Sequence, residues 1–350
     1  PALQEKRQAA AARAQAAAAD ALPTLAAPND ASKLTREQKV ELMKMTNVAG
    51  LEGEVVVRKP GDVAGWDMNI EGCKGCTIAI FDRIAALNGD ECEDCTLVIG
   101  PCCSSVFLRD CKNCRIVVAC QQFRTRKLEN CKVLIYSQTR PIVESSRGLR
   151  FGCYPLSYPQ LPEQMALAGL SPLCNPWSAV HDFTPSPLSY SVLTEAEQDA
   201  AAAEICALPA CAEVGADFGA ACVPLSLGSR AGRPPVTMHA VLLLSTIGTA
   251  ALARKLSELP GTLVRTDVLP GTKQLLNALK TAAMPPPALA KAAQTGATLV
   301  SVEAAGQSAA TLRAALEAVQ GGETAAVFEA TGISPDFLYP SYLDQGGQLK

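Results

Sequence analysis

The stretch from Gly75 to Ile135 decides the fold, because it contains one short pattern four times. The four copies are Gly75-Cys-Thr-Ile-Ala-Ile80, Asp94-Cys-Thr-Leu-Val-Ile99, Asn113-Cys-Arg-Ile-Val-Val118 and Asn130-Cys-Lys-Val-Leu-Ile135. Their starts are 19, 19 and 17 residues apart. A repeat shorter than about 20 residues cannot hold a pair of helices, but it fits three short strands joined by tight corners. We therefore predict a right-handed parallel β-helix with one copy per coil, in which stacked coils bury a continuous core.

The alternation of side chains within each copy is that of a half-buried strand. In the first copy Cys76, Ile78 and Ile80 fall on one face, and Thr77 falls on the other. Each copy begins with Gly, Asp or Asn, residues that tolerate the positive φ required at tight corners. The apolar face of every copy is therefore expected inside the β-helix.

Three Cys-x-x-Cys pairs, spaced like the ligands of a zinc ribbon, lie in the repeats. They are Cys73/Cys76, Cys92/Cys95 and Cys111/Cys114. The second cysteine of each pair is in register with the inward Ile and Leu side chains, where a thiol acts as a small apolar group. The fourth copy has Leu128 in place of the first cysteine. We therefore expect no metal site, but a ladder of thiols inside the helix. Its members are Cys76, Cys95, Cys114 and Cys131.

The composition narrows the class of protein. The chain has 350 residues, of which 48% are apolar, and its net charge of −3 gives no general attraction to nucleic acid. Its longest apolar run, Val236 to Ile247, is shorter than the roughly 20 residues of a membrane-spanning helix. The first 20 residues lack the apolar core of a signal peptide. We therefore expect a cytoplasmic protein that keeps its cysteines as thiols and binds no nucleic acid.

Composition and periodicity divide the chain into five parts. An Ala-rich segment of helical propensity precedes the β-helix, and a Pro-rich cap follows the last coil. After a stretch of small residues, strands and amphipathic helices alternate as in a ferredoxin-like α/β sandwich. The predicted boundaries are 1–45 for the helical N-terminal segment, 46–195 for the β-helix with its cap, 196–235 for a linker, 236–335 for the second domain and 336–350 for a tail. Strands of the second domain are expected at Met238–Ser245, Thr262–Val268, Ala297–Glu303 and Thr324–Glu329.

Four blocks in chain order resemble the tubulin cofactor C domain family. They are Ala119-Cys-Gln-Gln-Phe-Arg124, Arg140-Pro-Ile-Val-Glu-Ser-Ser146, Phe151-Gly-Cys-Tyr154 and Trp177-Ser-Ala-Val-His-Asp-Phe-Thr-Pro185. The likeness extends over residues 55–193 and is greatest to a member in which a nucleoside-diphosphate-kinase-like domain follows the β-helix. The resemblance therefore implies such a domain for residues 236–335. We expect no kinase activity from it, because its only histidine, His239, stands at the start of a strand.

The resemblance implies a function for Arg124 and Gln122. In the family a Gln-x-Arg element supplies an arginine finger to an Arf-like small GTPase in its GTP state. On a strand, Gln122, Arg124 and Arg126 fall on one face, while Phe123 takes the inward position of Val106 in the preceding coil. A guanidinium supplied in trans neutralises charge that develops on the transferred phosphoryl group. The partner would bind the GTP and the magnesium, so we expect no cofactor in this chain.

Three further residues are candidates for partner binding. Arg126 lies on the same predicted face as Arg124. The resemblance makes Glu144 either a contact of the GTPase or a positioner of the arginine, and a merely buried or paired carboxylate is the alternative. Phe183 is either an anchor of the cap or an apolar interface residue. Without the resemblance, Arg124 itself would be one more exposed strand arginine.

Three functions stay open at this point. The first is a GTPase-activating protein in ciliary or basal-body trafficking, which acts in trans and is not a stand-alone enzyme. The second is a structural scaffold of the cilium, flagellum or axonemal microtubules. The third is a tubulin-folding cofactor that acts on tubulin GTP with the same arginine. Similar family members begin with a Met-Gly-Cys lipidation signal, whereas this chain begins Pro1-Ala2-Leu3, so we expect no membrane tethering.

Overall fold

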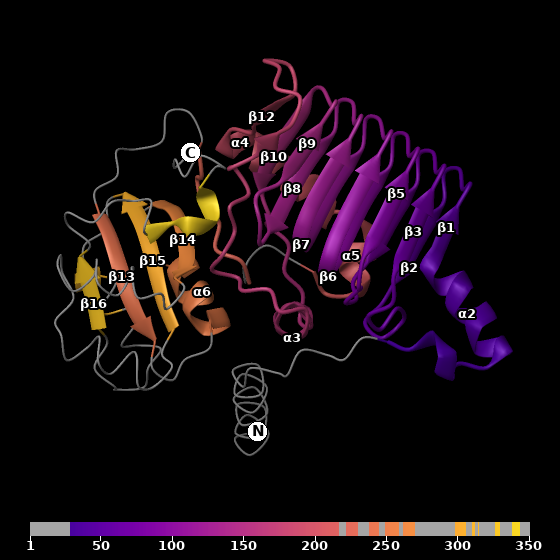
Figure 1. Ribbon diagram of the computed structural model, residues 1–350, viewed down its shortest axis with the longest axis horizontal. Helices are drawn as coiled ribbons and strands as arrows, with labels where there is room; N and C mark the ends of the chain where they lie inside the picture. Colours follow the sequence, from indigo (N-terminus) through magenta and orange to yellow (C-terminus); the bar gives the residue numbers. More distant parts are fainter. Residues whose placement is uncertain are drawn as a thin grey trace.

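A computed structural model gives the fold of most of the chain. It describes residues 29–216, 222–229, 238–244, 249–258, 262–269, 298–305, 310–311, 314, 326–329 and 338–343. These residues form a twelve-stranded parallel β-helix and a four-stranded antiparallel sheet (Figure 1). The coils stack in chain order, and the smaller sheet lies beyond the last coil.

Parallel pairing between successive coils confirms the repeat. The four copies are in register, because Thr77 pairs with Thr96, Thr96 with Arg115, and Arg115 with Lys132. Their first residues have positive φ as predicted, for example 55° at Asp94. The strands are β1 (Asn47–Ala49), β2 (Val55–Arg58), β3 (Met68–Glu71), β4 (Thr77–Ile80), β5 (Leu87–Asp90), β6 (Thr96–Arg109), β7 (Arg115–Arg126), β8 (Lys132–Ser137), β9 (Ile142–Glu144), β10 (Leu149–Cys153), β11 (His181–Asp182) and β12 (Tyr190–Val192).

The long strands β6 and β7 each run along two sides of the β-helix. Their first halves pair with each other and with β4 and β8, which makes one side. Their second halves pair with β5 and β9, which makes another side. Register shifts within β6 mark the corner between the two sides. The second side, which continues to β11, carries the candidate site.

The third side of the β-helix carries alternating charges that the repeat analysis missed. One residue per coil forms an isolated parallel bridge to the next coil, and these residues are Glu52, Lys74, Glu93, Lys112, Glu129 and Arg147. Ion pairs join Lys74 to Glu93 at 3.7 Å and Glu129 to Arg147 at 3.0 Å. Exposed pairs of this kind contribute little individually. A coil stacked out of order would, however, place like charges side by side, so the ladder favours the observed order.

The cysteines lie inside the β-helix, as the register predicted. The four thiols of the predicted ladder are all buried, and the first cysteines of the pairs form a second buried column that Leu128 continues. The Sγ of Cys114 lies 3.2 Å from the carbonyl oxygen of Lys112, and the other ladder thiols make the same contact two residues back. Within the described ranges, no group of three or more His, Cys, Asp or Glu side chains is arranged to hold a metal ion.

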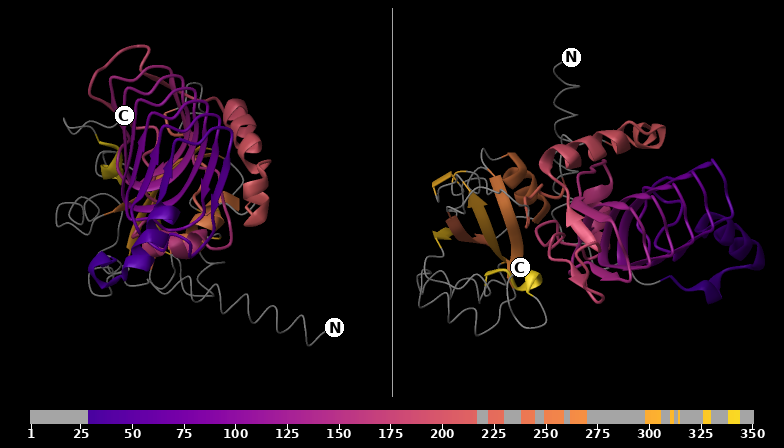
Figure 2. Two further views of the ribbon diagram at one scale, coloured as in Figure 1. Left: turned by 90° about the vertical axis from the view of Figure 1, so that its right-hand side faces the viewer. Right: turned by 90° about the horizontal axis from the view of Figure 1, so that it is seen from above.

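The prediction of a linker over residues 196–235 is wrong in its first half. This part forms α4 (Glu195–Cys206) and α5 (Pro209–Glu213), and α4 lies along the flank of the β-helix (Figure 2). Thr194 and Glu197 form a capping box at the start of α4. Ala201, Ala202 and Ile205 are buried against the strands. The alanines that suggested a linker are the small side chains that let this helix lie close to a sheet.

Two further helices flank the β-helix. The chain enters it through η1 (Ala31–Lys33) and α2 (Arg36–Thr46), where Thr35 and Gln38 form a capping box. The cap after the last coil contains α3 (Leu161–Leu167). The helix predicted in residues 1–28 lies outside the described residues and stays a prediction. None of the described helices combines the length and apolarity that a membrane span requires.

The second domain contains the four predicted strands. They are β13 (Met238–Leu244), β14 (Thr262–Leu269), β15 (Thr298–Ala305) and β16 (Ala326–Glu329), and α6 (Thr249–Glu258) connects the first two. The order is β14-β15-β13-β16, and every pair is antiparallel. This arrangement agrees with a β-α-β-β-α-β chain order. Most of the remaining connections lie outside the described residues.

The prediction of a tail over residues 336–350 is wrong for Leu338–Leu343. Leu338 and the rings of Tyr339 and Tyr342 are buried, and η2 (Pro340–Tyr342) forms there. The hydroxyl of Tyr342 donates a hydrogen bond to the carbonyl oxygen of Asn175 in the cap at 2.9 Å. Arg140 donates another to the carbonyl oxygen of Leu343 at 2.9 Å. The buried aromatic rings therefore hold this segment between the second domain and the β-helix.

The thiol ladder predicts how the core responds to a change of volume. Cys114→Leu adds side-chain volume to a filled interior and should lower the free energy of unfolding by about 1–3 kcal/mol. Cys114→Ala should cost about 1 kcal/mol, because it removes one buried atom. Urea unfolding followed by circular dichroism measures both, with the half-exposed Cys206→Leu as the matched control. A Cys114→Leu variant as stable as the unsubstituted chain would contradict a tightly packed interior.

Candidate functional site

The candidate site is built from two outward columns of side chains on the second side of the β-helix. Strand register defines them, because each residue is the pairing partner of the next. The first, called here the Arg124 column, contains Asn88, Phe107, Arg124, Ile142 and His181. The second, called the Arg126 column, contains Asp90, Arg109, Arg126 and Glu144.

Arg124 projects outward from a backbone that is fixed on both sides. Its neighbours Phe123 and Thr125 are buried, and Phe123 pairs with Val106 in the core, as predicted. The strand is paired with β6 on one side and β9 on the other. The Arg124 side chain is exposed. The outward direction of the guanidinium is therefore set by backbone pairing.

Among the described residues, the Arg124 guanidinium contacts an aromatic ring. Its Cζ lies over the ring of Phe107, 5.1 Å from the ring centroid. In the part of the chain that the structure describes, no carboxylate lies within 4.0 Å of its nitrogen atoms. An exposed guanidinium with no neutralising carboxylate can engage an anionic group of another molecule.

Gln122 accompanies Arg124, as the alternation predicted. It is half-buried, pairs with Ser105 of the preceding coil and lies two residues before Arg124 on the strand. The preceding carbonyl, that of Gln121, accepts hydrogen bonds from the backbone N–H and the hydroxyl of Thr139. Hydrogen bonds to the backbone therefore hold the strand at Gln121 as well as at Arg124.

The Arg126 column combines two arginines with two carboxylates. Arg109 forms an ion pair with Asp90, in which Nη2 donates a hydrogen bond to Oδ2 at 2.6 Å and Nε lies 2.5 Å from Oδ1. This pairing raises the pKa of Arg109, chiefly through the hydrogen bond to Asp90. The prediction from sequence missed the pair, although its members are 19 residues apart, the spacing of the repeat.

Glu144 lies next to Arg126 in the column, and its register partner is Arg126, not Arg124. Both side chains are half-buried, and the Nε of Arg126 is buried with no hydrogen-bond partner among the described residues. Of the alternatives for Glu144, direct positioning of Arg124 finds no support in this register. The register instead places Glu144 beside Arg126.

Phe183 lies at the end of the columns and is exposed. Its backbone N–H donates to the carbonyl oxygen of Val143, so it extends the pairing of β11 with β9 by one residue. The ring is 55% exposed and lies edge-on to His181 with 4.6 Å between the ring centroids. A cap anchor would be buried, so its exposure favours the interface alternative.

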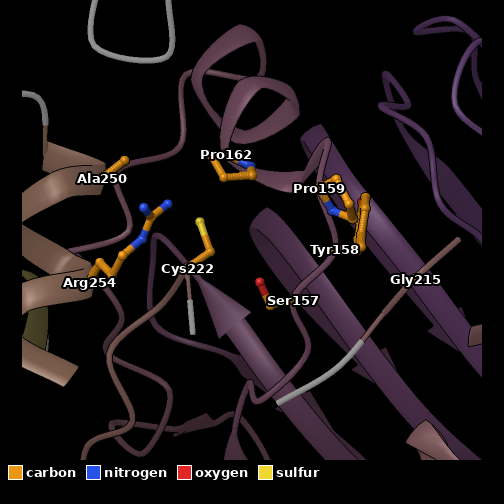
Figure 3. Close-up of a pocket in the computed structure, with 8 residues that line it drawn as sticks. All are labelled: Ser157, Tyr158, Pro159, Pro162, Gly215, Cys222, Ala250 and Arg254. Carbon is orange, nitrogen blue, oxygen red and sulfur yellow. The ribbon is translucent and has the colours of Figure 1, made fainter. Parts of the chain in front are cut away.

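A cavity of about 190 Å³ lies elsewhere, between the cap and α6 (Figure 3). It is lined by Ser157, Tyr158, Pro159, Pro162, Gly215, Cys222, Ala250 and Arg254. None of the predicted site residues belongs to it. Burial raises the pKa of Cys222 to about 12, so its sulfur is a thiol and not a nucleophilic thiolate near neutral pH. The cavity therefore lacks an activated nucleophile and does not replace the columns as the candidate site.

Part of the β-helix matches a known protein family. Residues 65–183 match the family described as tubulin binding cofactor C. This stretch contains all residues of the Arg124 and Arg126 columns, and it ends at Phe183. The matched stretch contains Gln122 and Arg124, whereas the second domain lies outside it.

Several curated relatives are similar to part of this chain. Protein XRP2 of Gallus gallus is 43% identical over 220 residues, which cover 61% of this chain and 61% of the relative. Protein XRP2 of Homo sapiens is 45% identical over 215 residues, 59% of this chain and 60% of the relative. Tubulin-folding cofactor C of Arabidopsis thaliana is 34% identical over 88 residues, 24% and 25% of the two chains. The chain thus matches about 61% of the length of the first of these relatives.

Among solved structures, the tubulin binding cofactor C of Leishmania major covers 43% of this chain and 90% of its own. The sequence identity is 20% and the TM-score is 0.32. The assignment of the parallel β-helix rests on the register of the coils described above.

The difference in burial predicts that two phenylalanines of this site contribute very differently to the free energy of unfolding. Phe123→Ala should lower the free energy of unfolding by about 3–5 kcal/mol, because it leaves a cavity in the core. Phe183→Ala should change it by less than about 0.5 kcal/mol, because the ring is exposed. Urea unfolding of the two variants measures the difference. Equal losses of stability would show that the register has been assigned to the wrong face.

Proposed function

We propose that this chain is a GTPase-activating protein for an Arf-like small GTPase and that Arg124 is its arginine finger. The observation that carries the proposal is the exposed Arg124 guanidinium, which stands on a strand paired on both sides and has no neutralising carboxylate among the residues that the structure describes. A finger of this kind stabilises the charge that develops on the transferred phosphoryl group.

Rigidity of the support is what makes this arginine suitable for transition-state binding. Groups that are already oriented lose little entropy when the reaction occurs, and they need no reorganisation as charge develops. β7 holds Arg124 at its outer face, while Phe123 and Thr125 anchor the same strand in the core. Mobility is then confined to the arginine side chain itself.

The neighbouring residues suit contacts with the partner. Gln122 would present its amide beside the finger, and Arg126 would meet acidic or phosphate groups, with Glu144 offsetting part of its charge. Phe183 and the half-buried Ile142 supply apolar surface next to these polar groups. Aromatic and Arg side chains are enriched at the centres of protein interfaces. GTP and magnesium would belong to the GTPase, and this chain would contribute no cofactor.

The second domain is proposed as a binding or structural module of the nucleoside-diphosphate-kinase-like kind. The strand order of its sheet supports the ferredoxin-like part of this proposal. His239 lies next to the hydroxyl of Tyr339, 3.2 Å from its Nδ1, and burial lowers its pKa. This part-buried contact joins the histidine to the segment Leu338–Leu343, which lies between the second domain and the β-helix. The proposed site of action is a cilium or its basal body.

Tubulin GTP is a second candidate substrate. The matching family and the Arabidopsis thaliana relative both carry tubulin in their printed names. The same arginine would serve, because the phosphoryl group to be stabilised is the same. The two candidates, an Arf-like GTPase and tubulin, therefore differ in whether their surfaces are complementary to the Arg124 and Arg126 columns.

Single-turnover hydrolysis of GTP tests the finger. Arg124→Ala should reduce the acceleration of an Arf-like GTPase by about 10³- to 10⁵-fold, because a finger in trans contributes that much. Arg124→Lys should recover only a small part, since an ammonium lacks the planar fork. Arg115→Ala, an exposed arginine at the other end of the same strand, is the matched control and should leave the rate unchanged.

The outcome that contradicts the proposal is full acceleration by Arg124→Ala. Tubulin assayed in parallel separates the two candidate substrates. If only tubulin responds and the response depends on Arg124, then the finger is retained and the Arf-like partner is excluded.

A further inference from the structure

An aromatic ring stands between two asparagines and the proposed finger in the Arg124 column. The positions in register with Arg124 on the two preceding strands are Phe107 and Asn88, and Asn69 precedes them. Phe107 is half-buried on the outer face, whereas its neighbours Val106 and Leu108 fill the core. The core is therefore complete without its ring. An apolar side chain at this outward position calls for an explanation beyond core packing.

Two guanidinium groups lie over the Phe107 ring. That of Arg124 is 5.1 Å from the ring centroid, and that of Arg109 is 5.3 Å from it. Both distances are within the roughly 6 Å over which a cation is attracted to an aromatic face. The ring thus connects the finger to a second arginine in the other column.

Arg109 is itself held in place. Its Nη2 donates a charge-assisted hydrogen bond to Asp90 Oδ2, and its Nε lies 2.5 Å from Oδ1 of the same carboxylate, so the ion pair restrains the guanidinium. Its charge is neutralised by the same carboxylate. Asp90, Arg109 and Phe107 therefore form a support, and Arg124 is the arginine of this group that has no carboxylate partner within the described ranges.

We propose that Phe107 is a positioning residue that holds the guanidinium of Arg124 in the orientation from which it enters a GTPase, an inference that rests on the proposed function. A free arginine side chain samples many rotamers, and the contact with the ring restricts them. A carboxylate would also restrain the finger, but it would neutralise the positive charge. The contact with the ring restrains the finger and leaves its charge available. The role is thus one of pre-orientation, and the ring itself need not touch the nucleotide.

Phe107→Leu and Phe107→Tyr test this role. Leucine keeps apolar bulk but has no aromatic face, whereas tyrosine keeps the face. At saturating concentrations of this chain, Phe107→Leu should lower the maximal rate of GTP hydrolysis by about threefold to tenfold, the scale of an exposed cation–π contact combined with lost orientation. Its affinity for the GTPase should change less than twofold. Phe107→Tyr should restore the rate.

The same variants have outcomes that overturn the inference. An unchanged maximal rate in Phe107→Leu, or a loss confined to affinity, would show that Phe107 does not position the finger. In an Arg124→Ala background, Phe107→Leu should have no further effect on the rate, because a positioning residue acts only through the group it holds. An undiminished additional loss there would also overturn it. Unfolding midpoints of the variants exclude a general loss of fold.

A measurement without any GTPase separates this inference from the proposed function. In the free protein, the ring of Phe107 should shift the side-chain Nε–H resonance of Arg124 in an NMR spectrum, and Phe107→Leu should abolish the shift. No difference between the two spectra would overturn the positioning role. If the shift is present but the unsubstituted chain accelerates no GTPase, then the stacking stands and the proposed function fails.

Discussion

Backbone pairing between successive coils is the constraint on which the rest of this structure depends. Because side chains alternate along a strand, the pairing of Val106 with Phe123 fixes one set inside and the other outside. A shift by one residue would bring Arg124 into the core and expose Phe123. The same register that buries the thiol ladder therefore also presents the proposed finger, and stability and function depend on one set of hydrogen bonds.

The sequence predicted those features that depend on local periodicity. The β-helix, the buried cysteines, the positive φ at Asp94 and the directions of Phe123 and Arg124 all follow from a repeat of 17 to 19 residues. Each of these features can be predicted from a residue and the residues that lie beside it on the neighbouring coils. The same periodicity places the second cysteines of the zinc-ribbon-like pairs among inward aliphatic side chains, and these cysteines are buried.

Features that depend on contacts between distant parts of the chain were not predicted. α4 resembles a linker in composition, and its docking becomes visible only when the flank of the β-helix is known. The segment Leu338–Leu343 is buried by Asn175 and Arg140, more than 160 residues away. The Asp90–Arg109 pair and the Phe107 stack obey the repeat spacing, but they require knowledge of which face each residue occupies. The strand register also shows that Glu144 pairs with Arg126 and not with Arg124.

A structure of this chain bound to an Arf-like GTPase with GDP, magnesium and aluminium fluoride tests the central claim most directly. The metal fluoride occupies the position of the transferred phosphoryl group. The account predicts that the guanidinium of Arg124 lies within hydrogen-bond distance of the fluoride, about 2.7–3.1 Å, while β7 keeps its pairing with β6 and β9. Arg124 left in solvent, or bound to a carboxylate of the partner away from the nucleotide, would contradict it.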